Sequence, residues 1–262
     1  MIDLRRRDGR PLVIAHRGAP RLAPENTIVS FRAAVELGVD LVELDVIALS
    51  SGPLVVAHSD RLEEITHGGT TGRIGGRSLE ELRELAPDLP TFDDVLDWFA
   101  REGGGVGLHV DLKLRARVGE AAEAIERFGL TERAVVSTFH GDVLRQVARA
   151  APGIRLGFTY PEDRLGVARR RMLRPAVRAG LSGLRLSLPA RLPQLLARTG
   201  ATALMLNHTL VTAGAVRRAH DLGVPVLAWT VDDLVEVDRV VGAGVDGVIT
   251  NDPGLLVATL AP

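Results

Sequence analysis

Residues 41–46 read LVELDV, an apolar run in which two carboxylates stand two positions apart. Side chains alternate between the two faces of a β-strand, so Glu43 and Asp45 are predicted to point the same way. Two carboxylates held in this way repel each other unless a counter-charge lies beside them. A hard divalent cation supplies that charge, because Mg²⁺ and Ca²⁺ prefer oxygen ligands. The stretch therefore predicts a buried strand that presents a metal site.

Two other apolar runs also end in polar side chains. The run at 12–15, LVIA, leads to His16 and Arg17, and the run at 54–57, LVVA, leads to His58. Histidine can act as a general base or acid near neutral pH, and arginine can hold a phosphate with two parallel hydrogen bonds. Such groups gathered at strand ends are typical of a functional site, and this set predicts phosphoryl chemistry.

Short apolar segments and longer amphipathic segments alternate about eight times along the 262 residues. The expected strands lie at 12–16, 40–46, 106–112, 134–138, 154–159, 202–206, 224–229 and 246–250, with a short returning strand at 54–58. Helices are expected at 91–101, 117–128, 141–150, 212–222 and 232–242. Residues 1–11 are interpreted as a polar leader. Residues 161–200 are interpreted as mostly helical, with 184–188 as a candidate strand.

This alternation predicts an α/β fold, a closed (β/α)8 TIM barrel in which residues 1–262 form a single domain. Residues 59–90 are expected to be a short, variable insertion loop after the second strand region. A doubly wound open sheet is the alternative, but the chain lacks a G-x-G-x-x-G start. In a barrel the functional groups lie at the C-terminal ends of the strands. The residues at those ends are His16, Asp45, Asp111, Trp229 and Thr250.

The composition excludes several classes of protein. The formal net charge is −1 and aromatic residues make up 3%, so neither a basic surface nor stacking platforms for a nucleic-acid partner are expected. The chain has no cysteine, which excludes disulfides and thiolate metal sites. No apolar run is long enough for a signal peptide or a transmembrane segment, so a cytoplasmic protein is expected. Nothing in the sequence specifies an oligomer interface.

The ordered motifs resemble the glycerophosphodiester phosphodiesterase family. They are AHRGAPRLAPENTIVSF from residue 15, VELDV from 42, VVAHSD from 55, LPTFDDVLDWF from 89, VDLK from 110, VVSTF from 135, AWTVDD from 228 and GVDGVITNDP from 244. The resemblance implies a metal-dependent phosphodiesterase on a TIM barrel that acts on a small-molecule glycerophosphodiester. Its products would be glycerol 3-phosphate and an alcohol. Mg²⁺ is the first choice of metal and Ca²⁺ the second.

The resemblance also implies roles for individual residues. His16 and His58 are the acid–base pair, and Arg17 contacts the phosphate. Trp229 is a wall for the alcohol moiety, and Phe139 is a second candidate wall. The residues alone do not say which histidine is the base.

Asp111 in the stretch HVDLK is the predicted third metal ligand. The family more often has glutamate here, so the ion would lie about one methylene closer to this strand or bind through a water. Lys113 shares the face of Asp111 and is predicted to neutralise phosphate charge, with an internal ion pair as its alternative role. His109 lies deeper on that face and is interpreted as a packed core histidine.

Three residues beside the histidines are interpreted as supporting groups. Glu25 and Asn26 are expected to order the first loop through turn and capping hydrogen bonds, with a place near the site as the alternative for Asn26. The family usually has aspartate directly after the second histidine, where this chain has Ser59. A carboxylate that orients His58 is therefore expected from Asp60 or from elsewhere in the chain.

Two rival functions stay open at this point. A lysophospholipid or phosphoinositide phosphodiesterase would need an apolar rim, for which few aromatic residues are available. A catalytically silent barrel that binds phosphodiesters would be favoured by loss of a histidine or of a metal ligand. This chain keeps both histidines and all three carboxylates.

Overall fold

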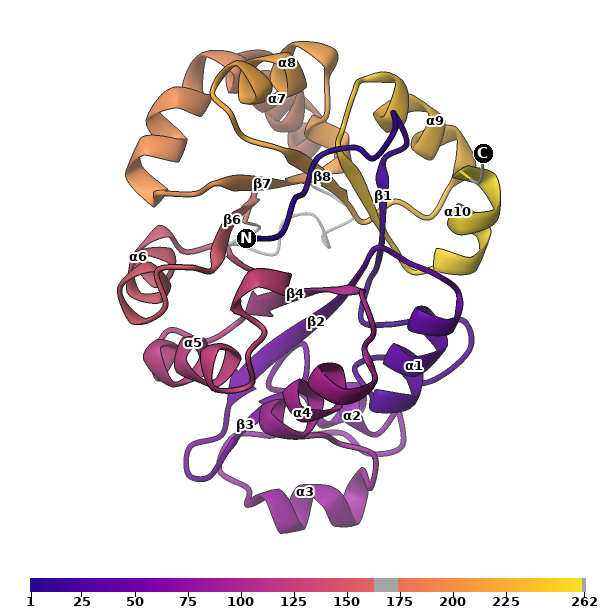
Figure 1. The fold of residues 1–262 in the computed structure, drawn as a ribbon, viewed down its shortest axis with the longest axis vertical. Helices are drawn as coiled ribbons and strands as arrows, with labels where there is room; N and C mark the ends of the chain where they lie inside the picture. Colours follow the sequence, from indigo (N-terminus) through magenta and orange to yellow (C-terminus); the bar gives the residue numbers. More distant parts are fainter. Residues whose placement is uncertain (163–173, 261–262) are drawn as a thin grey trace.

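The computed structural model describes residues 1–162 and 174–260 (Figure 1). Eight parallel strands in this part of the chain form a closed barrel. They are β1 (Leu12–Ala15), β2 (Leu41–Ala48), β4 (Gly107–Leu112), β5 (Ala134–Thr138), β6 (Arg155–Tyr160), β7 (Ala203–Asn207), β8 (Val226–Trp229) and β9 (Gly247–Thr250). Strand β1 pairs with both β2 and β9, which closes the barrel and confirms the predicted TIM fold.

Helices surround the barrel; all but the last, which follows the final strand, lie between successive strands (Figure 1). They are α1 (Ile28–Glu36), α4 (Phe92–Glu102), α5 (Val118–Arg127), α6 (Gly141–Ala150), α7 (Arg174–Thr199), α8 (Ala213–Asp221), α9 (Leu234–Gly242) and α10 (Pro253–Leu260), with 3-10 turns at Thr131–Arg133 and His208–Leu210. Among the described residues, no helix has both the length and the apolar character needed to cross a membrane.

The strand predicted at 184–188 is wrong, because this segment lies inside helix α7. Leu188, Leu192 and Leu196 are 1%, 0% and 8% exposed and repeat every four residues. This spacing places them on one side of a helix, which packs against the barrel. A short apolar run can belong to a buried strand or to a buried helix. Here the four-residue repeat, which extends beyond the run, identifies the helix.

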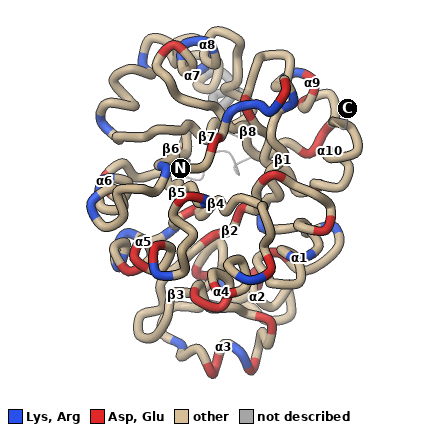
Figure 2. Tube along the Cα trace, in the orientation of Figure 1, with Lys and Arg blue, Asp and Glu red and all other residues tan. Residues whose placement is uncertain are grey.

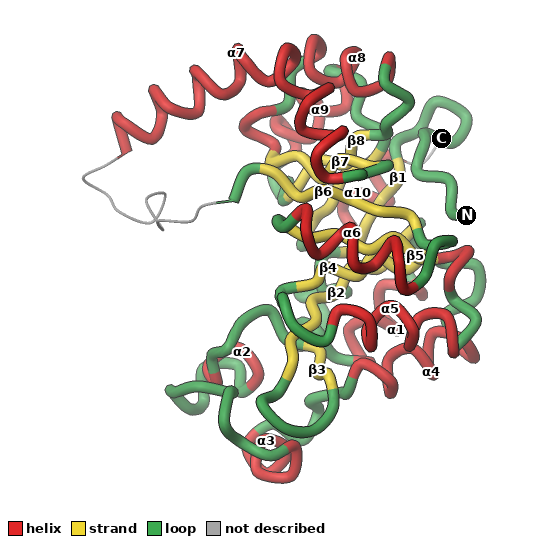
Figure 3. Tube along the Cα trace, turned by 90° about the vertical axis from the view of Figure 1, so that its left-hand side faces the viewer, coloured by secondary structure: helices red, strands yellow, loops and turns green. Residues whose placement is uncertain are grey.

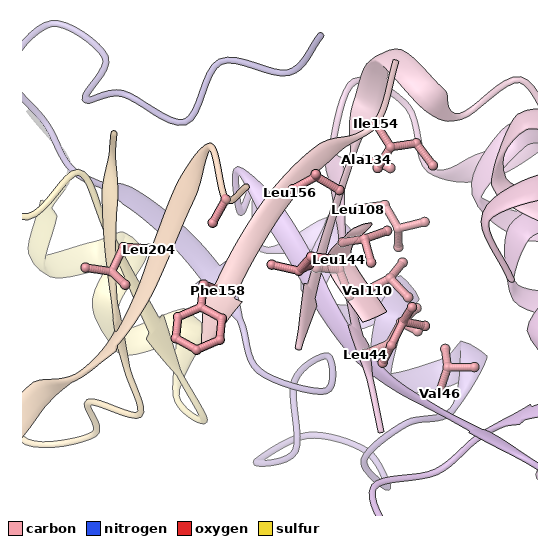
Figure 4. Close-up of a cluster of buried hydrophobic side chains, with 14 of the residues drawn as sticks. Leu44, Val46, Leu108, Val110, Ala134, Leu144, Ile154, Leu156, Phe158 and Leu204 are labelled. Atoms are coloured by element: carbon pink, nitrogen blue, oxygen red, sulfur yellow. The ribbon is translucent and has the colours of Figure 1, made fainter. Parts of the chain in front are cut away.

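Alternate residues of each strand face opposite sides of the barrel wall. Leu44 and Val46 of β2 and Val110 of β4 belong to the outer apolar core beneath the helices (Figure 4). The residues between them face inward, and the strand register aligns Glu43 with His109 and Asp45 with Asp111. The polar residues are therefore inside the barrel because the helices require the apolar set on the outside.

The insertion predicted at 59–90 follows a short strand outside the barrel. Strand β3 (Leu54–Val56) pairs antiparallel with β2, and helices α2 (Leu62–Ile65) and α3 (Leu79–Leu85) come after it. Their apolar side chains form a separate small core around Leu62, Ile74 and Leu82. Figure 3 shows α2 and α3 extending beyond the barrel on the side opposite the N-terminus.

The N-terminal segment, interpreted as a polar leader, packs across the opposite end of the barrel (Figure 1). Leu4 is 0% exposed and belongs to the inner core with Leu12 and Ile14. The basic part of this segment lies next to acidic positions (Figure 2), and Arg10 forms an ion pair with the buried Asp40 at 2.9 Å. The leader thus covers the end of the barrel where the strands begin.

Candidate active site

A pocket of about 550 Å³, counted with the open space at its mouth, lies at the C-terminal ends of the barrel strands. Eight of the nine predicted site residues line it: His16, Arg17, Glu43, His58, Asp111, Lys113, Phe139 and Trp229. Asp45 lies directly behind this lining and is 1% exposed. The barrel therefore brings together side chains that are far apart in the sequence.

The three predicted metal ligands form one buried acidic cluster. Glu43 and Asp45 come from β2 and Asp111 comes from the neighbouring β4. One carboxylate oxygen from each lies within 4.8 Å of the other two. The register that aligns Asp45 with Asp111 produces this convergence. We call these three residues the acidic triad.

Two cationic side chains compensate the triad in part. Lys113 Nζ lies 3.0 Å from Asp45 Oδ1 and also contacts Asp111, and Arg17 Nε lies 3.0 Å from Asp45 Oδ2. Burial alone would raise the pKa of Asp45, but Lys113 and Arg17 hold that pKa below its ordinary value. Burial and the charges of Asp45 and Asp111 raise the pKa of Glu43 well above its ordinary value. Three carboxylates against two cations leave one negative charge in excess.

This donor set fits a divalent metal ion. All three residues offer carboxylate oxygens, which are the ligands that Mg²⁺ and Ca²⁺ prefer. Asp45 Oδ1 is buried and, although Lys113 is near, accepts no hydrogen bond of good geometry. Burial and the neighbouring carboxylates of Asp45 and Asp111 raise the pKa of Glu43, as expected where negative charges are held close together. A cation would satisfy both the free oxygen and the excess charge.

Asn26 holds a triad residue in place. Its Nδ2 donates to Asp45 Oδ2 at 3.1 Å, and its Oδ1 accepts from the backbone N–H of Asp45 at 3.3 Å. Asn26 is 6% exposed and has a φ of 58°, directly before Thr27, the N-cap of α1. Its expected role was to order the loop, with a place near the site as the alternative. The specific contact with Asp45 was not predicted. The sequence PENT at 24–27, a few residues after HRG at 16–18, was the signal that could have indicated a place for Asn26 in the site.

Asp111 is held from the other side. Ser137 Oγ donates to Asp111 Oδ1 at 2.7 Å, and His109 Nε2 lies 2.8 Å from the same hydroxyl. Because Ser137 gives its proton to Asp111, the His109 ring donates to Ser137. His109 is 2% exposed, as expected for a core histidine, but it also lines the pocket.

His16 follows β1, and its side chain is 17% exposed. Its Nδ1 lies 2.7 Å from Asn251 Oδ1, and its Nε2 lies 3.9 Å from Glu43 Oε2. Burial, with a smaller contribution from Arg17, lowers the pKa of His16 from 6.5 to about 4. The imidazole is therefore neutral at neutral pH, as a proton acceptor must be.

His58 has a different environment. It lies just after β3, its side chain is 30% exposed, and its Nδ1 is 3.4 Å from Glu64 Oε1. The alternative that Asp60 orients His58 is wrong, because Asp60 binds the backbone N–H of Gly75 and the side chain of Arg73. Helix α2 supplies the carboxylate, so the expectation that it comes from elsewhere is the correct one.

Arg17 and Lys113 face the pocket as members of ion pairs. Arg17 donates from Nη1 to Glu25 at 2.8 Å and from its backbone N–H to Glu43 at 2.9 Å. Although burial alone would lower the pKa of Lys113, Asp111 and Asp45 raise it above its ordinary value. Both side chains therefore carry positive charge at the wall where a phosphate would add negative charge.

Two aromatic residues form the apolar wall of the pocket. Phe139 and Trp229 meet edge to face, with ring centroids 6.0 Å apart and an interplanar angle of 77°. Trp229 Nε1 donates to the backbone carbonyl of Met205 at 2.9 Å, which fixes the indole.

A second hollow of about 330 Å³ shares His58 with this pocket, and Glu25 and Glu64 also line it.

The chain matches known proteins along nearly its whole length. The model of the glycerophosphoryl diester phosphodiesterase family matches residues 16–255. A glycerophosphodiester phosphodiesterase from Caldanaerobacter subterraneus subsp. tengcongensis is 29% identical, with 94% of this chain and 96% of that protein covered.

Solved structures share the fold. An Oleispira antarctica phosphodiesterase in complex with the product sn-glycerol-3-phosphate is 22% identical, with a TM-score of 0.73 and 97% of each chain covered. A glycerophosphodiester phosphodiesterase from Parabacteroides distasonis is 23% identical, with a TM-score of 0.73 and 95% of this chain and 96% of that chain covered. With the family model matched over residues 16–255, this chain belongs to the glycerophosphoryl diester phosphodiesterase family.

Proposed function

We propose that this phosphodiesterase converts glycerophosphodiesters into glycerol 3-phosphate and an alcohol, with His16 as the general base and His58 as the general acid. The observation that carries the proposal is the difference between the two histidines at one pocket. The pKa of His16 is lowered to about 4, whereas His58 has the carboxylate of Glu64 3.4 Å from its Nδ1. A neutral imidazole accepts a proton, and a carboxylate beside Nδ1 orients the ring of a histidine that acts through its other nitrogen.

The acidic triad is the proposed metal site. Glu43, Asp45 and Asp111 would hold a divalent cation, with Mg²⁺ as the first choice and Ca²⁺ as the second. When bound, the ion supplies Lewis-acid stabilisation of negative charge on the phosphate oxygens. Arg17 and Lys113 add positive charge to the same wall and hold the diester against it.

Each displacement at phosphorus needs two proton transfers. His16 removes a proton from the attacking hydroxyl, which belongs either to water or to the glycerol carbon next to the phosphoester. His58 protonates the leaving alkoxide from the side of the second hollow, where the leaving alcohol would lie. Trp229 and Phe139 pack against the glycerol carbons. The chain has no cysteine, and His16 and His58 are sufficient for a route through a cyclic phosphate. A water then opens the ring to glycerol 3-phosphate, with His58 taking the proton of the water and His16 returning its proton to the glycerol oxygen.

A substrate without the adjacent hydroxyl tests this reaction. A hydroxyl on the substrate itself attacks with an effective concentration far above that of a separate molecule. We therefore expect the 2-deoxy analogue of glycerophosphocholine to react at least about 10²-fold more slowly than glycerophosphocholine. Initial rates, with ³¹P NMR to detect the cyclic phosphate, measure this. Equal rates reject the cyclic route and leave direct attack by water. If the protein turns over none of the glycerophosphodiesters tested, the proposed function is contradicted.

Trp229→Ala tests the apolar wall. Truncation removes packing that the ground state and the transition state share, so KM is expected to rise about tenfold with little change in kcat. Trp229→Phe is the matched control, because it keeps an aromatic face against Phe139. Steady-state kinetics of both variants provide the comparison. An unchanged KM in the alanine variant would limit Trp229 to packing in the barrel.

Three expectations stay predictions from the sequence: a single domain over residues 1–262, a cytoplasmic location and no nucleic-acid partner.

A further inference from the structure

Two residues with no assigned role in the reaction form a hydrogen-bond chain that ends at Nδ1 of His16: Asn251 contacts the ring, and Asp232 contacts Asn251. Asn251 follows β9, and the pairing of Ala15 with Thr250 places it beside His16. Asn251 Oδ1 lies 2.7 Å from His16 Nδ1, and Asn251 Nδ2 donates to Asp232 Oδ2 at 2.7 Å. Asp232 lies in the segment between β8 and α9.

Asp232 determines which way the Asn251 amide points. A carboxylate only accepts hydrogen bonds, so the nitrogen of the amide must face Asp232. The other oxygen of Asp232 accepts from the Thr250 hydroxyl at 3.1 Å and from the Asn251 backbone N–H at 2.7 Å. These bonds hold the carboxylate in place. The amide oxygen of Asn251 is therefore turned toward His16.

The amide oxygen in turn determines the tautomer of His16. A neutral imidazole has one N–H donor and one acceptor nitrogen. Since Asn251 presents an acceptor, the proton is on Nδ1 and the lone pair is on Nε2. On the pocket side, Glu43 Oε2 is 3.9 Å from Nε2, which is too far for a hydrogen bond. Among the described contacts of the His16 ring, only the hydrogen bond with Asn251 determines which ring nitrogen carries the proton.

We infer that Asp232 and Asn251 are positioning residues, which hold His16 as the Nδ1–H tautomer and keep its Nε2 lone pair free for proton abstraction in the pocket. The inference rests on the proposed role of His16 as the general base. Neither residue touches the substrate in this role, because both lie behind the ring.

The isosteric change Asp232→Asn is expected to reverse the chain of hydrogen bonds. The oxygen of the introduced amide keeps the bonds from the Thr250 hydroxyl and the Asn251 backbone, so its nitrogen faces the Asn251 side chain. The amide of Asn251 then turns over and presents its nitrogen to His16. That arrangement favours the Nε2–H tautomer, which has no lone pair in the pocket. A base in the wrong tautomer loses on the order of 10²–10⁴-fold in kcat.

The double change Asp232→Asn with Asn251→Asp is expected to restore the original polarity. The amide introduced at position 232 then donates to one oxygen of the carboxylate introduced at position 251, and the other oxygen of that carboxylate accepts from His16 Nδ1–H. The double variant differs from Asp232→Asn only by one further isosteric exchange. A structural role limited to filling space would not produce this recovery of kcat.

The tautomer can be measured independently of turnover. Protein with ¹⁵N-labelled histidine, with and without added Mg²⁺, gives ring nitrogen shifts that distinguish the Nδ1–H and Nε2–H forms. The signal of His16 among the seven histidines is identified by its loss in His16→Ala. We expect Nδ1–H in the native protein and in the double variant, and Nε2–H in Asp232→Asn.

Asp233→Asn is the matched control. Asp233 caps helix α9 by accepting from the backbone N–H groups of Val235 and Glu236, which asparagine also does. It is expected to keep the native kcat and the native tautomer. Thermal unfolding of every variant shows whether the fold is retained.

The outcomes separate the inference from the proposed function. A native tautomer in Asp232→Asn, or no recovery in the double variant, overturns the inference. A changed tautomer with unchanged kcat shows that the hydrogen-bond chain works as described but that His16 is not the base. In that case the proposed role of His16 as the general base is rejected, and Asp232 and Asn251 have no positioning role in catalysis.

Discussion

His16→Ala is expected to lower kcat by about 10²–10⁴-fold, because the change removes the proposed general base. The expected cost in stability is small, since the side chain lies at the end of β1 and contacts the pocket rather than the outer apolar core. Steady-state kinetics and thermal unfolding measure the two effects. Near-normal turnover with native stability would refute the assignment of His16.

His58→Ala is expected to reduce kcat by a similar factor for glycerophosphodiesters with ordinary alcohols. The general acid matters only when the leaving alkoxide needs a proton. A substrate with a nitrophenol leaving group therefore recovers much of its rate in His58→Ala but not in His16→Ala. This comparison identifies which histidine is the acid. If the rate with the nitrophenol substrate recovers in His16→Ala instead, His16 is the general acid and His58 the general base.

His67→Ala is a control for the histidine variants. His67 lines the second hollow beside His58 but belongs to the insertion and has no proposed role in proton transfer. Its kcat is expected to stay within a few-fold of the native value, because His67 takes part in neither proton transfer. Any effect is expected in KM, since the hollow would hold the leaving alcohol.

Exhaustive chelation is expected to abolish turnover, and added Mg²⁺ or Ca²⁺ to restore it. Arg17 and Lys113 compensate the negative charge of the acidic triad only in part, since Arg17 also pairs with Glu25. A cation that binds only the folded protein also stabilises it, by about 2.7 kcal/mol at one hundred times Kd. The rise in Tm on adding the metal therefore measures binding without reference to activity.

Asp45→Asn is expected to remove both the activity and the metal-dependent rise in Tm, because Asp45 has the buried oxygen that accepts no hydrogen bond. Asp97→Asn is the matched control, since Asp97 pairs with Arg101 on the exposed side of α4. Full turnover after complete removal of metal would overturn the metal site. So would a metal-dependent rise in Tm that persists in Asp45→Asn.

A screen across glycerophosphodiesters with and without chelator also addresses the two rival functions. A silent phosphodiester-binding barrel would bind these compounds without turning any of them over. A lysophospholipid or phosphoinositide phosphodiesterase would prefer substrates with acyl chains or inositol. We expect metal-dependent turnover of the small diesters, because Phe139 and Trp229 form a compact apolar wall in a pocket of limited size.

The sequence determined the barrel and the inward-facing side chains of the acidic triad. In β2 the apolar residues alternate with Glu43 and Asp45, and a strand with this pattern buries its apolar face whatever its neighbours are. The motifs around His16, His58 and Asp111 also identify the family. These features are local, because each depends on residues within a few positions of one another.

Only the tertiary structure decided which groups support those side chains. The contact between His16 and Asn251 joins residues 235 positions apart and depends on the register of β1 with β9. Glu64 reaches His58 because helix α2 folds back over the end of β3, whereas the nearer Asp60 turns away to bind Arg73. No local pattern of polarity encodes such contacts. They arise from strand register and helix placement, which the packing of the whole barrel determines.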